Sequence, residues 1–411
     1  MALSSQSITD ISIFMHSKKI AIIGGGIIGL ATAYKLQLKN PKHKVIVFEK
    51  ENEFGTHQSG RNSGVLHCGL AYNPGSLKAR LAKSGIEQMT NFCLTHQISH
   101  DICGKIVVAS SEAQIKHLDE AAYKGDKNGL LNLKFLTKSE LKLREPYVVA
   151  KKALLVPQEG IVDFKSVMQK MLLLIKEKNG EIKLGSKIKS IVKKNNSEIL
   201  SDGFNEWSFD LVINCTGLHS DKNYERFTKK NRPFRIIPFR GEYMTLKPNA
   251  KKLVNHLIYP APDPQFPFLG IHFTRLTNGK RELGPNAVLA LKREGYKNTD
   301  FSLNQLIDTI SYKGFYKFIY KNLKFSLEEF SSSLSIERFI KKAQLLVPEI
   351  DSSMVESGTS GVRAQAMSAT GELIMDFRIV KENNQIHVIN SPSPGATASF
   401  AIADYIIENY I

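Results

Sequence analysis

The chain has 411 residues, of which 42% are apolar and 23% are charged. This composition is typical of a folded globular protein, and the length favours two domains. The net charge is +17, but Lys and Arg residues are spread over the whole chain without a recognised nucleic-acid-binding motif. We therefore expect no nucleic-acid partner. A solvated, lysine-rich surface explains the charge most simply, and attraction to an acidic membrane surface is the alternative.

The sequence carries no sign of a membrane span or a secretory signal. No apolar run approaches the roughly 20 residues that cross a bilayer, and residues 1–17 lack an apolar core. Met15 is a candidate start of the protein, so we expect residues 1–14 to be a disordered extension. We expect a cytoplasmic protein with reduced thiols and no metal site, because no metal spacing links its cysteines, Cys68, Cys93, Cys103 and Cys215. The positive charge would allow association with the inner face of the cytoplasmic membrane.

The first strongly patterned segment runs from Lys18 to Glu49. It predicts a strand over 20–23, a helix over 27–38 and a second strand over 45–48, with three glycines between the first strand and the helix. Strand, G-x-G-x-x-G, helix, strand and terminal acid together form the dinucleotide-binding fingerprint. A glycine-rich turn without a ligand is the alternative, and the complete frame argues against it.

Each residue of the fingerprint has a physical reason. Gly24 permits the tight turn, Gly26 lets a pyrophosphate approach the backbone, and Gly29 lets the helix lie close to the strand. The free amides and the dipole of the helix start attract phosphate. Glu49 follows Gly29 by 20 residues, where a carboxylate accepts the ribose hydroxyls and disfavours a 2′-phosphate.

The rest of the chain alternates between helical and extended patterns. Residues 55–85 begin with a long polar loop, and such loops tend to be functional. From Arg235 onward short strands alternate with proline-rich turns, which predicts an antiparallel sheet. Asp163 is a candidate N-cap. The predicted helices cover 77–96, 112–127, 139–144, 163–179, 221–232, 301–345 and 399–409, and the predicted strands cover 105–109, 181–183, 187–192, 209–214, 243–246, 268–273 and 386–389.

Several longer motifs identify a family. They are HQSGRNSGVLHCG at 57–69, GSLKA at 75–79, GIVD at 160–163, INCTGLHSD at 213–221, IPFRGEY at 237–243, IYPAPDPQFPFLGIHFT at 258–274, LGPNAVLALKREGY at 283–296, GVRAQA at 361–366 and SPSPGATAS at 391–399. From about Lys18 onward the chain resembles the FAD-dependent oxidoreductases of the D-amino-acid-oxidase type, and within them the branch that oxidises L-2-hydroxyglutarate. The tyrosine pair usual in that branch is Ala71-Tyr72 here.

The resemblance implies an α/β fold, α+β overall, with a discontinuous cofactor domain. A Rossmann-type FAD-binding domain would comprise residues 15–95, 150–235 and 345–411. Residues 96–149 and 236–344 would form a substrate domain whose antiparallel sheet covers the flavin. The sequence pattern itself agrees with this division, because short strands and proline-rich turns begin at Arg235.

The resemblance also implies which residues contact FAD. The loop after Pro394 would place helix-start amides near the flavin N1–C2=O edge, where negative charge develops on reduction. Ile188 would contact the adenine side. The full expected set is Gly24, Gly26, Ile27, Ile28, Gly29, Glu49, Lys50, Ser59, Asn62, Ser63, Gly64, Ile188, Thr216, Gly217, Arg363, Ser393, Pro394, Gly395, Ala396 and Thr397.

For the substrate, oxidation of a 2-hydroxy acid requires a base for the hydroxyl proton. His67 is the candidate, because neutral imidazole suits that task near pH 7, and His272 is its rival. A dicarboxylate needs cations, for which Arg240 and Arg363 are candidates, since a guanidinium can hold a carboxylate through two hydrogen bonds. The remaining substrate contacts are expected from Tyr72, Tyr259 and His272.

The expected reaction is FAD-dependent oxidation of L-2-hydroxyglutarate to 2-oxoglutarate, with hydride transfer from C2 to flavin N5. Electrons would pass to a membrane quinone or to oxygen. An amino-acid oxidase or dehydrogenase of the same fold is the first alternative, but these motifs contain no acid to pair with a substrate amine. A flavoprotein with a structural or tRNA-modifying role is the second, and the absence of a basic stripe argues against it.

Overall fold

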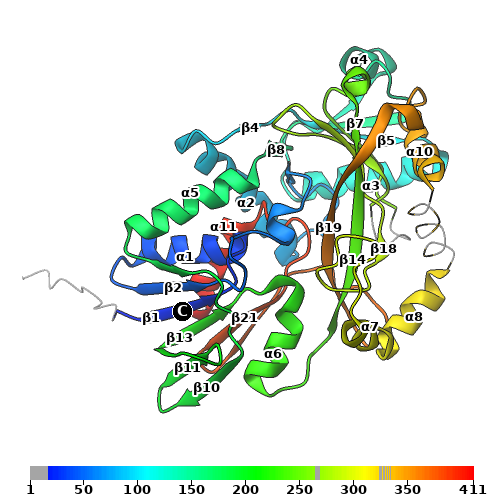
Figure 1. Ribbon diagram of the computed structural model, residues 1–411. Coiled ribbons are helices and arrows are strands. Elements are labelled where there is room, and N and C mark those ends of the chain that lie inside the picture. Colours follow the sequence, from blue (N-terminus) through cyan, green and yellow to red (C-terminus); the bar gives the residue numbers. More distant parts are fainter. Residues whose placement is uncertain are drawn as a thin grey trace, which may run out of the picture.

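The computed structural model describes residues 17–263, 269–323, 326, 329, 331, 333 and 335–411. The extension expected at 1–14 lies outside these residues. Figure 1 shows two parts side by side, one built on a sheet that contains β1 (Lys19–Ile23) and the other on a sheet dominated by two long strands, β14 (Arg235–Leu246) and β19 (Val355–Met367).

The first sheet is the expected nucleotide-binding sheet. Within the described residues it has six strands in the order β20-β21-β13-β1-β2-β9. The strands β21, β13, β1, β2 and β9 run parallel, and β20 is antiparallel to β21. Their bounds, besides β1, are β2 (Lys44–Phe48), β9 (Glu181–Lys183), β13 (Leu211–Asn214), β20 (Arg378–Glu382) and β21 (Gln385–Asn390).

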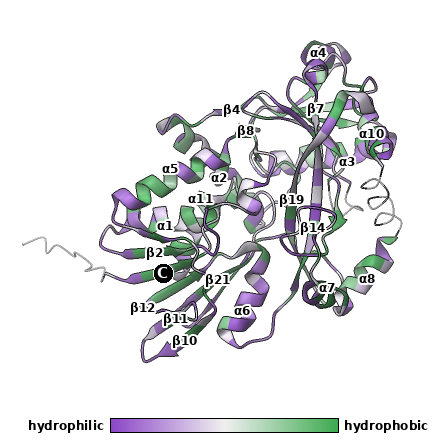
Figure 2. Ribbon diagram, viewed as in Figure 1, coloured by the Kyte–Doolittle hydropathy of each residue, from purple (hydrophilic) through white to green (hydrophobic). Residues whose placement is uncertain are grey.

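Both faces of this sheet are covered, which explains why its strands are apolar without alternation. Ile20 and Ile22 pack in a core with one layer of helices, α1 (Ile27–Lys39), α2 (Leu77–Thr95), α5 (Phe164–Glu177) and α11 (Ser399–Tyr410). Ala21 and Ile23 face the opposite core, formed by α6 (Ser220–Thr228) and the meander β10 (Ser190–Lys194), β11 (Ser197–Ser201) and β12 (Glu206–Phe209). Figure 2 shows these hydrophobic strands between the two layers.

The second sheet is larger and mixes distant parts of the sequence. In the part of the chain that the structure describes, it has nine strands, ordered β18-β14-β17-β16-β15-β5-β7-β6, with β19 paired to β14. Its pairs are antiparallel as expected, except that β15 runs parallel to β5. The other bounds are β5 (Lys105–Ala109), β6 (Lys134–Leu136), β7 (Lys152–Val156), β15 (Leu257–Pro260), β16 (His272–Arg275), β17 (Arg281–Gly284) and β18 (Val288–Leu289).

The membership of this sheet bears on the expected domains. Both β7 and β19 belong to it, although their residues fall in segments that we assigned to the FAD-binding domain. The division into domains stays a prediction.

A small third sheet joins the two parts. Among the described residues it has three strands, β3 (Val65–Leu66), β8 (Gly160–Val162) and β4 (His100–Asp101), with β8 in the middle. Leu66 lies opposite Gly160 in the antiparallel ladder. A Cβ at position 160 would lie 2.3 Å from the carbonyl oxygen of Asp101, so only glycine fits this central place.

Most predicted helices lie within a few residues of those in the structure, and one predicted cap is confirmed. The region predicted as helical over 301–345 is divided into several helices, and the helix predicted over 221–232 ends at Thr228. The Asp163 carboxylate accepts hydrogen bonds from the amides of Lys165 and Ser166 at 3.0 and 3.3 Å, at the start of α5. The remaining helices are α3 (Glu112–Lys127), α4 (Lys138–Arg144), α7 (Leu303–Ile310), α8 (Lys313–Lys321) and α10 (Ile336–Gln344), with short 3-10 helices at Gln58–Gly60, Gly217–His219, Pro248–Leu253 and Ser352–Met354.

The strand boundaries depart more from prediction. The strand predicted over 187–192 begins at Ser190, which leaves Ile188 in the segment before β10. The strand predicted over 268–273 begins at His272, and Phe268 lies outside the described residues. None of the helices in the described part of the chain combines the length and hydropathy that a bilayer crossing requires.

Candidate active site

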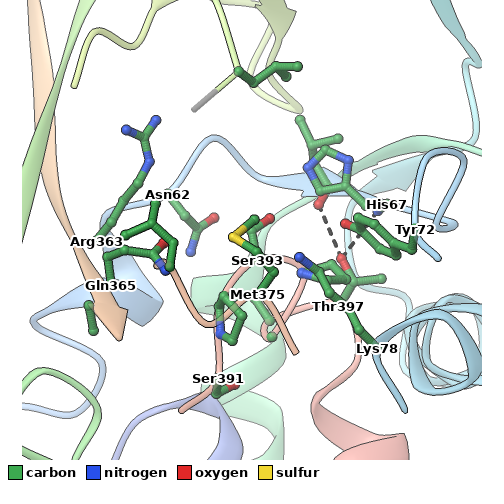
Figure 3. A pocket seen from close by; sticks show the side chains of 18 of the residues that line it. Asn62, His67, Tyr72, Lys78, Arg363, Gln365, Met375, Ser391, Ser393 and Thr397 are labelled. Atoms are coloured by element: carbon green, nitrogen blue, oxygen red, sulfur yellow. Dashed lines mark hydrogen bonds between the residues drawn. The ribbon is translucent and has the colours of Figure 1, made fainter. Parts of the chain in front are cut away.

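A single cavity of about 960 Å³ runs between the two large sheets. It extends from the glycine turn before α1 to His67 and Arg363, and on to the loop before α11. Figure 3 shows Arg363 on one side of it and His67 with Tyr72 on the other. The expected site residues that line the cavity are Gly26, Ile27, Ile28, Ser59, Asn62, Ser63, His67, Tyr72, Gly217, Tyr259, His272, Arg363, Ser393, Pro394, Gly395, Ala396 and Thr397.

The start of α1 fits the phosphates of a dinucleotide. The amide of Ile27 donates to the Ser59 hydroxyl at 2.9 Å, whereas the amides of Gly26 and Ile28 have no acceptor among the described residues. A Cβ at position 26 would lie 3.0 Å from the Ser59 hydroxyl oxygen, so glycine keeps the approach open. These amides, at the positive end of a helix dipole, form an anion site.

The loop before α11 presents a second group of donors. Within the described residues, the amides of Ala396 and Thr397 have no acceptor, and both residues line the cavity. The Thr397 hydroxyl is held in place, because it donates to the Val65 carbonyl at 3.2 Å and accepts from the His67 amide at 3.3 Å (Figure 3). The residues present therefore fit the electron-rich edge of a flavin ring.

Several expected cofactor residues support the site from behind the cavity wall. A Cβ on Gly29 would lie 2.0 Å from the Gly24 carbonyl oxygen, and a Cβ on Gly24 would lie 2.5 Å from the Cys215 carbonyl oxygen, so both glycines are needed for packing. The Glu49 carboxylate accepts from the amides of Gly25 and Glu51 at 2.7 and 2.9 Å. It shapes the turn in this structure, and its contact with a ribose stays a prediction.

Lys50 belongs to an ionic cluster and does not line the cavity. Its ammonium bonds Glu51, and it lies 2.7 Å from Glu294 and 3.0 Å from the His57 ring. The carboxylates of Glu51 and Glu294 lie close enough to His57 to suggest a metal site. However, the Lys50 ammonium already contacts both carboxylates and offsets one of their two negative charges, so we interpret the group as an ion-pair network.

Three further expected cofactor contacts are also absent from the cavity lining of the described residues. Gly64 passes behind it, with its carbonyl accepting from the Val162 amide at 2.8 Å. Thr216 turns its hydroxyl to Asn214 at 2.7 Å. Ile188 is buried in the core beneath β1 with Phe48. Their contacts with a cofactor stay a prediction.

His67 belongs to a charged group centred on the buried carboxylate of Glu159. Its Nδ1 lies 3.2 Å from Oε2 of Glu159, and the same oxygen lies 2.7 Å from Nζ of Lys105. Burial alone would raise the pKa of Glu159, but Lys105 and His67 outweigh it and lower this pKa to about 2. An ionised carboxylate only accepts hydrogen bonds, so Nδ1 of His67 carries the proton.

The rival histidine has a different environment. His272 stacks on Tyr259 with ring centroids 3.9 Å apart, and its Nδ1 lies 2.9 Å from the Gly270 carbonyl oxygen. Burial lowers the pKa of His272 to about 3, so its imidazole is neutral at pH 7.

The two candidate arginines have different positions. Arg363 lies opposite Phe239 in the ladder of β14 and β19, lines the cavity, and donates to the Asn286 carbonyl at 3.3 Å. Successive residues of a strand point to opposite faces, so the same register turns Arg240 away. Its guanidinium holds Glu242 at 2.9 and 3.0 Å. The geometry therefore keeps Arg240 out of the described cavity lining, and its contact with a substrate stays a prediction.

Lys78 is a cavity residue that the sequence reading did not assign. It is 8% exposed, and its ammonium lies 4.4 Å from the centroid of the Tyr72 ring. No other partner of this ammonium is found within the described residues. Burial lowers the pKa of Lys78 to about 8, although the nearby Asp376 opposes the shift. Such an ammonium is suited to an anionic ligand.

Lys105 and Glu159 were also not predicted as site residues, because of their positions in the sequence. Lys105 opens a strand and Glu159 precedes the GIVD motif at a turn, and both places usually expose a charge to water. The available signal was the position of Glu159 immediately before a motif shared with the family. Lys78 had a similar signal, because it lies within GSLKA.

Comparison with known proteins also points to an FAD-dependent oxidoreductase. The sequence profile of a family described as FAD dependent oxidoreductase matches residues 19–409. An L-2-hydroxyglutarate dehydrogenase of Indibacter alkaliphilus is 44% identical over 390 residues, which cover 95% of this chain and 98% of that protein. A mitochondrial L-2-hydroxyglutarate dehydrogenase of Dictyostelium discoideum is 40% identical over 408 residues, covering 95% of this chain and 91% of the relative.

Solved structures share the fold at lower identity. The dithionite-reduced L-alpha-glycerophosphate oxidase from Mycoplasma pneumoniae with FAD bound has a TM-score of 0.77 at 21% identity, covering 96% of this chain and 94% of its own. Glycine oxidase from Geobacillus kaustophilus has a TM-score of 0.71 at 16% identity, with the same two coverages, 96% and 94%. These likenesses confirm the expected fold.

The environment of Lys78 leads to a prediction about stability. The pKa falls from 10.5 in an exposed lysine to about 8 here, so the buried ammonium costs stability below pH 8. That cost disappears as the pH rises toward 10.5. Lys78→Met should therefore stabilise the flavin-free protein by about 3 kcal/mol at pH 7, with a smaller gain at pH 10. Urea unfolding measures both values.

Lys116→Met, at an exposed position of α3, is the matched control and should change little at either pH. A Lys78→Met protein that is less stable than the wild type at pH 7 would show that the ammonium has a stabilising partner.

Proposed function

The chain belongs to the family of FAD-dependent oxidoreductases, and from this premise we propose that it oxidises L-2-hydroxyglutarate to 2-oxoglutarate. The relatives at 44% and 40% identity support this substrate, because each matches nearly the whole chain. The structural observation that carries the proposal is the continuity of one cavity, which joins the amides before α1 to a histidine and an arginine.

FAD, when bound, accepts the hydride that leaves C2 of the substrate. The residues that would hold it are those at the start of α1, including Gly26, Ile28 and Ser59, together with Ala396 and Thr397 before α11. The second group supplies amides where negative charge accumulates on reduction.

His67 is the proposed base. It takes the hydroxyl proton at Nε2, because Nδ1 already donates to Glu159. No partner of Nε2 is found in the described parts of the chain, and His67 lines the cavity. His272 is a poorer base, since an imidazole with a pKa of about 3 binds a proton too weakly near pH 7. Loss of the hydroxyl proton and of the C2 hydride leaves the ketone of 2-oxoglutarate.

Positive charge in the cavity suits a dicarboxylate. We assign Arg363 to one carboxylate of the substrate, since a guanidinium fork matches the two oxygens. Lys78 adds a second positive charge, while the hydroxyls of Tyr72 and Tyr259 offer donors to the same ligand. An amino-acid substrate is less well served next to His67, because the acid at that place, Glu159, is already paired with Lys105.

An anaerobic reduction assay tests the substrate. The purified flavoprotein is mixed with L-2-hydroxyglutarate, D-2-hydroxyglutarate, malate, lactate and a set of amino acids, and the flavin absorbance near ~450 nm is followed. We expect bleaching by L-2-hydroxyglutarate at a rate at least tenfold above that for any other compound. Bleaching by amino acids without bleaching by hydroxy acids would overturn the proposal in favour of an amino-acid oxidase.

Two variants separate the proposed roles of base and cation. His67→Ala should retain FAD and lose at least a hundredfold in the limiting rate of flavin reduction, the usual size of a general-base contribution. Arg363→Met should instead raise the substrate concentration for half-maximal reduction at least tenfold, because it removes a charged hydrogen bond. Stopped-flow absorbance gives both quantities. Near-normal reduction by His67→Ala would exclude His67 as the base.

The electrons must then leave the reduced cofactor, and we propose a membrane quinone as acceptor, with oxygen as the alternative. A surface formed by α7 and α8, at the edge of the molecule away from the six-stranded sheet, supports membrane contact (Figure 1). Leu303, Ile307 and Ile310 follow helical spacing along α7, yet all three are exposed. They give α7 an apolar face directed to solvent.

The neighbouring helix has the chemistry of a membrane interface. Tyr316 and Tyr320 of α8 are exposed, and so are the lysines at 313, 317 and 321. Aromatic rings at headgroup depth and lysines against anionic lipid are the usual features of interfacial helices. The net charge of +17 acts in the same direction. The occupant we propose for this α7–α8 surface is an anionic phospholipid bilayer.

Vesicle cosedimentation tests the surface. The wild type should sediment with vesicles containing phosphatidylglycerol, and much less with pure phosphatidylcholine. Leu303→Ser combined with Ile307→Ser should lower the bound fraction several-fold without changing flavin content. Leu143→Ser, an exposed leucine on α4, is the matched control. Equal binding by the double variant and the wild type, or no binding by either, would contradict the proposal.

A further inference from the structure

The ion pair of Glu159 and Lys105 lies next to His67, where it can influence the base as well as stabilise the fold. We propose that Glu159 is a positioning residue for His67, which fixes the ring with Nε2 toward the substrate and strengthens it as a base, and that Lys105 limits this effect. The inference rests on the proposed function, in which His67 is the base.

The backbone brings these side chains together before any side-chain interaction forms. The antiparallel register of β3 and β8 places Leu66 opposite Gly160, so the next residue, His67, comes to lie beside Glu159. Lys105 arrives on β5, because the amide of Gly104 donates to the Glu159 carbonyl at 2.8 Å. Three separate parts of the chain thus meet at one carboxylate.

The burial of Glu159 makes its partners decisive. Its side chain is 1% exposed, and its only charged contacts within the described residues are Lys105 at 2.7 Å and His67 at 3.2 Å. The Cys68 amide donates to the other oxygen at 3.4 Å. A carboxylate withdrawn from water interacts strongly with a charge that develops nearby. When His67 accepts a proton, the imidazolium gains a partner that is already in place.

Other groups around His67 contribute less directly to its charge. Tyr259, on β15, meets the His67 ring edge to face at 6.2 Å between ring centroids. His272 on β16 and Arg363 on β19 act on the same region through space. The remaining polar neighbours are Tyr72, Lys78, Cys68 and Thr397, which line the cavity or border it. Among the described residues, Glu159 is the charged group that contacts the ring, and Lys105 acts on it through this carboxylate.

The two members of the pair should shift the pH dependence of flavin reduction in opposite directions. Glu159→Gln removes the negative charge and should move the midpoint of the pH–rate profile down by at least about one unit, the usual effect of an opposite charge at this range. The high-pH plateau should fall at least tenfold. Lys105→Met removes the positive charge and should move the midpoint upward.

The double variant Glu159→Gln/Lys105→Met keeps the balance of charge, so its midpoint should return to within about half a unit of the wild type. The double variant also keeps the test possible if a single variant fails to fold because it leaves a buried charge unpaired. Asp101→Asn is the matched control, because Asp101 lies on the same small sheet and pairs with Arg275 at 2.9 Å without contacting His67. It should leave the midpoint unchanged.

A spectroscopic measurement complements the kinetics. NMR of isotope-labelled histidine should show the neutral His67 ring protonated at Nδ1 in the wild-type holoenzyme, and a mixture of tautomers in Glu159→Gln. A merely structural ion pair would change stability and leave the tautomer and the midpoint alone.

The outcomes separate this inference from the proposed function. If His67→Ala loses flavin reduction while Glu159→Gln and Lys105→Met keep the wild-type midpoint, the positioning role is overturned and the base stands. If both single variants shift the midpoint in the same direction, the charge argument is wrong. If His67→Ala reduces flavin normally, both the role of His67 as base and the positioning role of Glu159 are wrong.

Discussion

The structure depends on two close approaches of backbone around the first glycine turn. A Cβ on Gly29 would lie 2.0 Å from the Gly24 carbonyl oxygen, and a Cβ on Gly24 would lie 2.5 Å from the Cys215 carbonyl oxygen. Glycine at both places lets α1, β1 and the end of β13 meet without side chains between them. This contact determines where the helix amides point, and therefore where a cofactor can lie relative to the second sheet.

The cofactor end and the chemical end of the cavity are joined by short strands, beside a hydrophobic core that both large sheets share. β3 follows the loop that lines the expected cofactor site, and it pairs with β8, which leads directly from the second sheet. His67 leaves β3 toward Glu159, while Thr397 before α11 holds the His67 backbone from the other side. The acid–base group is thus tied to both ends at once, which limits its freedom to tilt relative to a bound ring.

Local patterns predicted the nucleotide-binding part well. The strand, turn and helix around Gly24 and Gly26, and the cap at Asp163, depend on neighbouring residues, so the sequence contains the information directly. His67 and Arg363 were brought to the cavity as the family motifs implied. Arg240 was not, because the register of a long-range strand pair decides which face a side chain takes, and this register cannot be read from one strand alone.

Three charged residues of the cavity region were not predicted either, because their environment also depends on contacts between distant segments. Lys78, Lys105 and Glu159 are charged, and a charge in a single sequence predicts exposure. Their burial results from contacts between segments far apart in the chain. Similarly, the parallel pairing of β15 with β5 joins residues about 150 positions apart, and no local sequence pattern predicts it.

The position of the last elements has a consequence for how the protein is made. β21 pairs with β13 in the interior of the first sheet, and α11 packs against α1. A ribosome that has produced only the first two thirds of the chain has therefore exposed a half-covered apolar sheet with its flavin-facing loop still missing. The expected cofactor site is therefore complete only when the C-terminal residues have been added, and until then the nascent chain exposes an unpaired strand edge, a common starting point of aggregation.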